Sequence, residues 1–243
     1  MRKVLLLAMT LFAASGCGGT SSPLHPTILL FNGTGTSPNS VKAVEELLNQ
    51  LRLPYVTLDS HDLNQLKPSE FDSFRLIIVP GGNYIEMGNS LDPKTTAAIH
   101  NSVQGGVNYL GICAGGLLAG DAECNSLNLT SGVKFGFYAE VNRGIHKSVV
   151  PISFVDGPAQ EFYWEDGPHF EGWGNIVGKY IDGTPAVVQG HSMEGIVILV
   201  GVHPEAPNKW RHGMQFKTPT HVNKEFAALL IKSALQGTEL PHF

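Results

Sequence analysis

The sequence has little of several features that mark specialised classes of protein. Only three of its 243 residues are cysteine, which is too few for the disulfide framework of a small secreted fold. Its 16 basic residues are outnumbered by 21 acidic ones, so no basic field is present to bind nucleic acid. With 42% hydrophobic and only 15% charged residues, the composition is that of a packed globular protein.

Long apolar runs, repeats and metal-binding spacings are also missing. No apolar segment reaches the roughly 20 residues that a transmembrane helix needs. No repeat or charge run divides residues 26–243, which predicts a single domain there. The histidines and cysteines show neither Cys-x-x-Cys nor His-x-x-x-His spacing, so we expect no metal ion and no other cofactor.

The N-terminus is typical of an export signal. Arg2 and Lys3 precede an apolar run over 4–14, which is the right size for a secretory signal and too short to span a bilayer. The next residues, 14–17, resemble the bacterial lipobox, in which cleavage leaves an N-terminal cysteine that carries lipid. We expect residues 1–16 to be a lipoprotein signal peptide and Cys17 to be lipidated. Cleavage without lipidation is the alternative.

The predicted lipid on Cys17 makes a membrane one expected partner of the protein. Residues 17–25 contain several glycines and serines, which suit a flexible tether, and residues 26–243 form the folded domain. The expected location is the bacterial cell envelope, on the periplasmic side of the outer membrane if the source is Gram-negative.

The apolar pattern predicts alternating strands and helices. Continuous apolar runs indicate buried strands at 27–31, 55–58, 76–79 and 107–112. Apolar residues at helical spacing indicate helices over 41–51, with Ser40 as N-cap, and around 95–103. This alternation predicts an α/β fold with a mostly parallel central sheet covered by helices.

The C-terminal part of the chain has a different pattern. Residues 130–185 are rich in glycine, aromatic and β-branched residues without helical period, so we expect extended or irregular structure. A hairpin is predicted from 187–190 and 196–202, with its turn at 192–195. An amphipathic helix over 225–235 then closes the fold.

Three segments with reactive or flexible residues each follow a predicted strand. They are residues 80–82, residues 111–116 around Cys113, and residues 202–205. The carboxyl ends of parallel strands meet at one edge of a sheet, where functional groups gather. We therefore expect the three segments to form one active site.

Cys113 lies in a pattern typical of a nucleophile elbow. Gly111 and Gly115, two positions to either side, relieve the crowding of a sharp strand-to-helix turn. Such a turn places the thiol at a helix N-terminus, whose partial positive charge favours the reactive thiolate. Simple packing of a buried cysteine is one alternative, and a disulfide with Cys124 is another.

His203 and Glu205 are the candidate catalytic partners of the thiol. Residues two apart in extended backbone share a face, so Glu205 is expected to orient the imidazole while His203 takes the thiol proton. The backbone N–H groups of Gly82 and Ala114 are expected to form an oxyanion hole. A surface turn without catalytic role is the alternative interpretation of the His-Pro-Glu sequence.

Aromatic residues crowd into the segment 160–173 and predict a binding wall. Its polar members, among them Asp166, would be costly to bury without partners, so part of the segment is expected to face a solvated cleft beside Cys113. Ordinary core packing of the rings is the alternative. The expected substrate contacts are Gly81, Asn83, Tyr163 and Asp166.

Together these segments resemble the class I glutamine amidotransferase-like superfamily. Within it, the sequence resembles the domain found at the N-terminus of eukaryotic biotin-protein ligases and in free-standing bacterial proteins. The matching segments are 80–82, 109–115, 163–170 and 201–205. The resemblance covers about residues 26–235. It implies a flavodoxin-like three-layer α/β/α sandwich with a triad of Cys113, His203 and Glu205.

The residues after Cys113 differ from those of glutaminases. True glutaminase subunits follow the cysteine with a bulky residue, a glycine and then a His-Gln or Met-Gln pair, whereas this chain continues with AGGL over 114–117. This difference argues against glutamine as the substrate. The related deglycase and intracellular protease branch is disfavoured because it places a glutamate just after the first strand, where this chain has NGTG over 32–35.

The resemblance implies a cysteine hydrolase or amidotransferase-like enzyme. Its expected substrate is a small molecule with an amide or acyl group, which would react through a thioester on Cys113. A lipoprotein that binds a ligand or scaffolds a partner in the same pocket, without turnover, is the alternative.

Overall fold

The architecture was determined from a computed structural model that describes residues 27–139 and 146–243. The predicted signal peptide and Cys17 lie outside the described residues. In the described part of the chain, no helix combines the length and the apolar character needed to cross a membrane.

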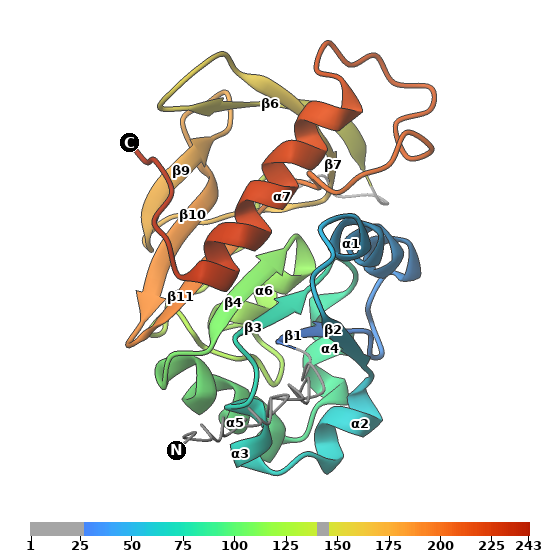
Figure 1. The fold of residues 1–243 in the computed structure, drawn as a ribbon. Coiled ribbons are helices and arrows are strands. Elements are labelled where there is room, and N and C mark those ends of the chain that lie inside the picture. Colours follow the sequence, from blue (N-terminus) through green and yellow to red (C-terminus); the bar gives the residue numbers. More distant parts are fainter. Residues whose placement is uncertain (1–26, 140–145) are drawn as a thin grey trace, which may run out of the picture.

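Helices and strands alternate along the first half of the chain, and strands dominate the second half (Figure 1). The elements are β1 (Ile28–Phe31), α1 (Pro38–Gln50), β2 (Tyr55–Leu58), α2 (Ser60–Gln65), α3 (Pro68–Phe71), β3 (Leu76–Val79), α4 (Tyr84–Ser90), α5 (Pro93–Gln104), β4 (Asn108–Ile112), α6 (Ala114–Ala119), β5 (Gly136–Phe137), β6 (Lys147–Phe154), β7 (Gln160–Glu165), β8 (Pro168–His169), β9 (Asn175–Lys179), β10 (Pro185–Ser192), β11 (Gly195–Val200) and α7 (Thr220–Gln236).

The main sheet has nine strands in the order β2-β1-β3-β4-β11-β10-β9-β6-β7. The first five of these strands pair in parallel, and the remaining pairs are antiparallel. The predicted parallel core is therefore confirmed, and an antiparallel extension is added to it. Strand β7 ends the sheet at one edge, although a bridge between Tyr163 and His203 brings it back to the segment after β11.

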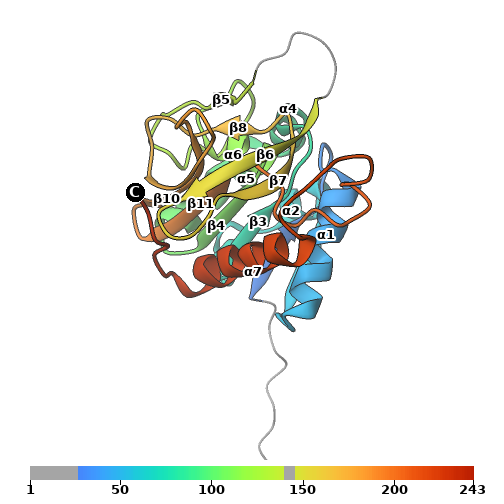
Figure 2. The same cartoon turned by 90° about the horizontal axis from the view of Figure 1, so that it is seen from above.

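Both faces of the parallel strands are buried, which explains their continuous apolar runs. In β1, Ile28 and Leu30 pack with residues of α1 and α7, whereas Leu29 and Phe31 pack with residues of α2, α5 and α6. Figure 2 shows α7 on one side of the sheet and α6 on the other. The result is the predicted three-layer α/β/α sandwich.

Most predicted elements are confirmed, with two differences. The hairpin of β10 and β11 closes where Ser192 pairs with Gly195, and the predicted region of extended structure contains β5 to β9. The short helices α2, α3 and α4 were not predicted, because each is too short for a clear helical period. The assignment of Ser40 as N-cap is wrong: Pro38 begins α1, Ser37 is the N-cap, and Ser40 is buried inside the helix.

Candidate active site

Cys113 occupies a sharp turn between β4 and α6. Its backbone has φ 51° and ψ −109°, a conformation that L-residues adopt only under strain. The flanking glycines are needed for close approach: a Cβ on Gly115 would lie 2.1 Å from the carbonyl oxygen of Val79, and one on Gly111 would lie 2.5 Å from that of Gly115. The predicted elbow geometry is thus present.

His203 and Glu205 form a buried pair after β11. The Nδ1 atom of His203 lies 2.8 Å from Oε1 of Glu205, and the carboxylate has no exposed surface. The expected extended geometry is wrong, because the N–H of Ala206 donates to the carbonyl of His203 and closes a tight turn. The turn achieves the same pairing, with the backbone of His203 held by a bond from its N–H to the Tyr163 carbonyl at 2.9 Å.

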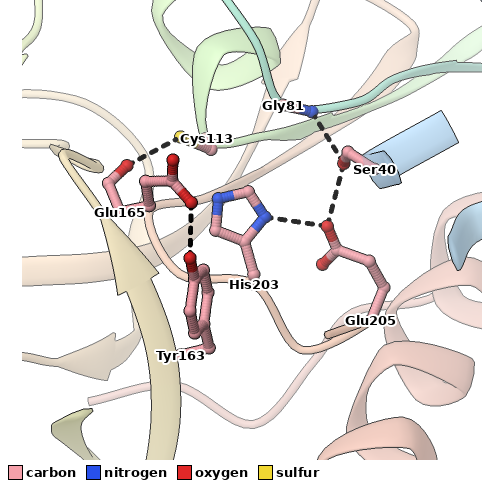
Figure 3. Close-up of polar contacts among 7 residues, drawn as sticks. All are labelled: Ser40, Gly81, Cys113, Tyr163, Glu165, His203 and Glu205. Atoms are coloured by element: carbon pink, nitrogen blue, oxygen red, sulfur yellow. Dashed lines mark hydrogen bonds and ion pairs between the residues drawn. The ribbon is translucent and has the colours of Figure 1, made fainter. Parts of the chain in front are cut away.

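The imidazole of His203 lies between the two other members of the predicted triad. Figure 3 shows one ring nitrogen directed at Glu205 and the other on the side of Cys113. Burial by itself lowers the pKa of an imidazole, but the charges of Glu205 and Cys113 reverse this effect and raise the pKa of His203 well above its usual value. The site therefore favours the protonated, imidazolium form of His203.

Ser40, which was predicted to be a helix N-cap, belongs to this site instead. Its side chain is completely buried, and its Oγ lies 3.0 Å from Oε1 of Glu205 and 3.1 Å from the backbone nitrogen of Gly81. The sequence pattern could have indicated this role, because Ser40 shares the buried face of α1 with Val44 and Leu47. A polar residue on an apolar face needs a buried partner.

Strand β7 supplies the wall beside the nucleophile. The Sγ atom of Cys113 lies 3.6 Å from the carbonyl oxygen of Glu165, and the Tyr163 hydroxyl donates to Oε2 of Glu165 at 2.5 Å. Burial, followed by the bond to Glu165 and its charge, raises the pKa of Tyr163 far above its usual value, so the hydroxyl remains a donor. The predicted aromatic segment thus lies next to Cys113.

A cavity of about 330 Å³ opens onto the thiol and the imidazole. Its walls come from the N-terminal end of α1, the turn after β3, the elbow, β6, β7 and the segment after β11. The lining residues are Ser37, Asn39, Ser40, Gly81, Gly82, Cys113, Lys147, Tyr163, Glu165, His203, Lys209 and Trp210. Hydroxyl, amide and charged groups predominate, so the cavity suits a small polar ligand.

The four predicted substrate contacts divide into two that line this cavity and two that do not. Gly81 and Tyr163 line it. Asn83 is not among the lining residues; its side chain accepts the N–H groups of Ile85 and Glu86 and so caps α4. Asp166 is not among them either: its carboxylate accepts the backbone N–H of His146, and the preceding residue, Glu165, lines the cavity. The substrate contacts of these residues stay predictions.

The two predicted oxyanion donors have different surroundings. Gly82 lines the cavity. It lies in a short β-bridge whose two bonds run from Ser37 N–H to the Gly81 carbonyl and from Asn83 N–H to the Gly35 carbonyl. The N–H of Gly82 itself takes no part in this bridge. Its φ of +151° and the 2.1 Å between an added Cβ and the Gly35 oxygen require glycine. Ala114 is buried in the first turn of α6 and does not line the cavity with its side chain. Its role as a donor stays a prediction.

One alternative from the sequence is answered by the described residues. Cys113 and Cys124 are both free thiols, so the disulfide between them is wrong. Among residues 27–139 and 146–243, no group of three or more His, Cys, Asp or Glu side chains is arranged to hold a metal ion.

A larger cavity of about 650 Å³ lies elsewhere, at the edge where β3 and β4 begin. It is lined by residues of α3 and α5 with the segments leading into these strands, including Asp72 and Arg75. Its described lining holds neither cysteine nor histidine. The nucleophilic chemistry therefore belongs to the smaller cavity.

Comparison with known proteins connects this site to a family. Residues 26–146 match the family model described as "Biotin-protein ligase, N terminal". These residues belong to that family. They include the turn after β3 and the elbow of Cys113, whereas His203 and Glu205 lie beyond the matched segment.

Two known proteins align with most of this chain. An uncharacterised protein of Chlamydia muridarum is 26% identical over 207 residues, which cover 73% of this chain and 80% of that protein. A biotin–protein ligase of Schizosaccharomyces pombe is 24% identical over 208 residues, covering 73% of this chain but only 33% of the ligase. The likeness to the ligase is thus confined to a third of its length.

Solved structures confirm the class I glutamine amidotransferase-like fold of this chain. A glutamine amidotransferase shares a TM-score of 0.57 at 16% identity, over 84% of this chain and 98% of the other. A glutamine amidotransferase from Thermotoga maritima shares a TM-score of 0.58 at 12% identity, over 87% and 99% of the two chains. At these identities the likeness concerns the fold alone.

Proposed function

We propose that this amidotransferase-like protein is a cysteine hydrolase or acyl transferase that acts on a small polar amide or acyl compound. The observation that carries the proposal is the position of Cys113, in a strained elbow beside the buried His203–Glu205 pair and open to a cavity. A nucleophile, a base and a group that orients the base are the three parts that acyl transfer requires.

The proposed reaction has two stages. In the first, the Cys113 thiolate attacks the carbonyl carbon, a carbon–sulfur bond forms, and the carbonyl electrons move to oxygen. The N–H groups of Gly82 and Ala114 would stabilise that oxyanion. When it collapses, the bond to the leaving nitrogen or oxygen breaks, and the leaving group takes a proton from the His203 imidazolium. The product of this stage is a thioester.

In the second stage, His203 acts as a base. Neutral after the first stage, it takes a proton from water or from an acceptor alcohol or amine, whose oxygen or nitrogen attacks the thioester carbon. The carbon–sulfur bond then breaks and restores the Cys113 thiolate beside the imidazolium. Glu205 holds the ring in position throughout, through its bond to Nδ1.

The cavity restricts the class of substrate. A volume of about 330 Å³ lies at the small end of the range for ligand sites. Lys147, Glu165 and Lys209 place charges of both signs in its walls. Glutamine is not the proposed substrate because of the residues after Cys113, and biotin chemistry is not proposed because the alignment with the ligase covers only a third of that protein.

Activity-based labelling tests the proposal. A panel of small acyl and amide electrophiles is applied to the wild type, to Cys113→Ala and to the control Cys124→Ala. Labelling and turnover in the wild type and the control, with loss in Cys113→Ala, are expected. If ligands bind in the cavity but no probe labels Cys113 and no product forms, the protein is the non-catalytic binding module of the alternative hypothesis.

We also propose that lipid on Cys17 anchors the protein in a bacterial envelope, a hypothesis that rests on the lipobox-like residues 14–17. Metabolic labelling with a fatty-acid analogue should mark the wild type and not Cys17→Ser, whereas Cys124→Ser should be marked like the wild type. An unlabelled wild type that is still exported would show simple signal cleavage instead.

A further inference from the structure

The buried carboxylate of Glu205 depends on more than His203. Its Oε1 atom lies 2.8 Å from His203 Nδ1 and 3.0 Å from Ser40 Oγ, whereas its Oε2 atom is buried without a hydrogen-bond partner among the described residues. A buried carboxylate keeps its charge only when donors compensate for the lost water. Ser40 is thus one of two donors that hold this anion.

The surroundings of Ser40 determine which way its hydroxyl points. The backbone N–H of Gly81 donates to Oγ at 3.1 Å, and this occupies one lone pair of the hydroxyl. An ionised carboxylate has no proton to give, so the bond between Ser40 and Glu205 has the hydroxyl as donor. The three bonds form one directed chain from Gly81 through Ser40 to Glu205, with His203 joining from the other side (Figure 3).

This chain also connects two catalytic parts that come from distant segments. Gly81 directly precedes Gly82, the proposed oxyanion donor, and an added Cβ on Gly81 would lie 2.7 Å from Cε1 of His203. The turn after β3 therefore packs against the imidazole and is held in place by a side chain of α1. Ser40 sits at the junction, completely buried.

We propose that Ser40 is a positioning residue of the proposed Cys113–His203–Glu205 triad, which holds the Glu205 carboxylate in place and secures the turn that carries Gly81 and Gly82. The inference rests on the proposed function, because Ser40 lines the cavity but makes its bonds to Glu205 and Gly81 rather than to the thiol. It acts through Glu205. Without the hydroxyl, the Glu205 carboxylate loses one of its two hydrogen-bond donors, its hold on the His203 imidazole weakens, and the imidazole supports the Cys113 sulfur less well.

The test measures the pH dependence of Cys113 alkylation by iodoacetamide, followed on the Cys113 peptide by mass spectrometry. In Ser40→Ala the midpoint is expected to rise by about half a pH unit, so alkylation below the midpoint slows roughly threefold. Ser40→Thr, which retains the hydroxyl, should restore the wild-type midpoint. The other titratable groups of the cavity, Lys147, Tyr163, Glu165 and Lys209, are the same in every variant.

Ser233→Ala is the matched control. Ser233 is also a buried helical serine, with 4% of its surface exposed, but it lies on α7 and does not line the cavity. Its removal should change thermal stability without moving the midpoint. If Ser40→Ala does not fold, Ser40→Cys, which is nearly isosteric and a weaker donor, is measured in the same way and should shift the midpoint in the same direction.

The outcomes separate this inference from the proposed function. If His203→Ala raises the midpoint but a folded Ser40→Ala keeps the wild-type profile, Ser40 is only a packing residue and the inference fails. If wild-type Cys113 titrates like an ordinary thiol and His203→Ala changes nothing, the proposed triad itself fails. A shift in Ser40→Ala that Ser40→Thr reverses supports both.

Discussion

The surroundings of Cys113 and Cys124 differ greatly, although the two free cysteines make similar local contacts. Each sulfur lies 3.6 Å from a backbone carbonyl oxygen, that of Glu165 for Cys113 and that of Tyr84 for Cys124. Cys113, however, sits at φ 51° in an elbow, beside His203 and a cavity. Cys124 lies on the C-terminal side of α6, half-buried against α4.

The difference shows that distant neighbours, rather than the residue type, determine what a cysteine can do. Burial raises the pKa of the Cys124 thiol above its ordinary value, and no cation among the described residues opposes this effect. Cys113 is also buried, but His203 comes to it from a segment that follows a different strand. The surroundings of the Cys124 thiol thus disfavour a negative charge, whereas a cationic imidazole lies beside the Cys113 thiol.

Glycine substitutions should give the largest contrast between the two regions. In Gly115→Ala the new Cβ would meet the backbone of Val79 at 2.1 Å, so we expect a loss of about 3 kcal/mol of unfolding free energy, at the upper end for overpacking. In the control Gly88→Ala, the nearest atom is the movable sulfur of Cys124 at 2.6 Å, and the loss should be smaller. Urea denaturation measures both. Equal losses would show that the elbow is not specially constrained.

Competitive alkylation should separate the two thiols by roughly 100-fold at pH 7. The ordinary pKa of 9.0 for Cys124 is raised further, so less than about 1% of it is thiolate at that pH. Because a raised thiol pKa delays ionisation, the Cys124 rate should climb about tenfold per pH unit until that pKa is passed, and at pH 7 it should stay below the Cys113 rate. Mass spectrometry of the two peptides measures the rates. Equal alkylation rates of the two peptides at pH 7 would refute the difference between the two thiols.

Replacing His203 should make Cys113 behave more like Cys124. Without the imidazolium, the Cys113 sulfur loses its cationic partner, so the alkylation rate at pH 7 should fall about 30-fold in His203→Ala. His191→Ala, which changes an exposed histidine on β10, is the control and should leave the rate unchanged. An unaltered rate in both variants would mean that His203 does not activate the thiol.

Glu205→Gln should give the smallest of these effects. The amide retains the shape of the side chain but removes the negative charge that helps to raise the pKa of His203, while the Cys113 charge remains. We expect a roughly fivefold slower alkylation at pH 7, less than for loss of the imidazole. Glu161→Gln on β7, outside the cavity, is the control. A loss as large as that of His203→Ala would show that Glu205 alone decides the charge of the ring.

The parts of the site that the sequence predicted correctly depend on short segments. Small residues at 111 and 115 indicate an elbow because the crowding in such a turn is local. His203 and Glu205 pair across a single turn, so their spacing of two was informative, although the backbone conformation was not. The aromatic character of β7 likewise indicated a wall beside Cys113.

The errors came from contacts whose partners are far apart along the chain. Ser40 bonds to Glu205 across 165 positions, so its polar character was interpreted as a local helix cap. Asp166 was chosen over Glu165 because composition alone does not establish the strand register. The Asp166 carboxylate accepts the backbone N–H of His146, and Asp166 does not line the cavity.

The sequence by itself determined the strands, the parallel core, the elbow and the candidate nucleophile, because each follows from apolar period or from backbone freedom within a few residues. Only the tertiary structure decided which side chains surround the thiol. Those contacts depend on how β7, α1 and the segment after β11 pack around the elbow. Packing among distant segments is a property of the whole folded chain, and no local pattern of residues records it.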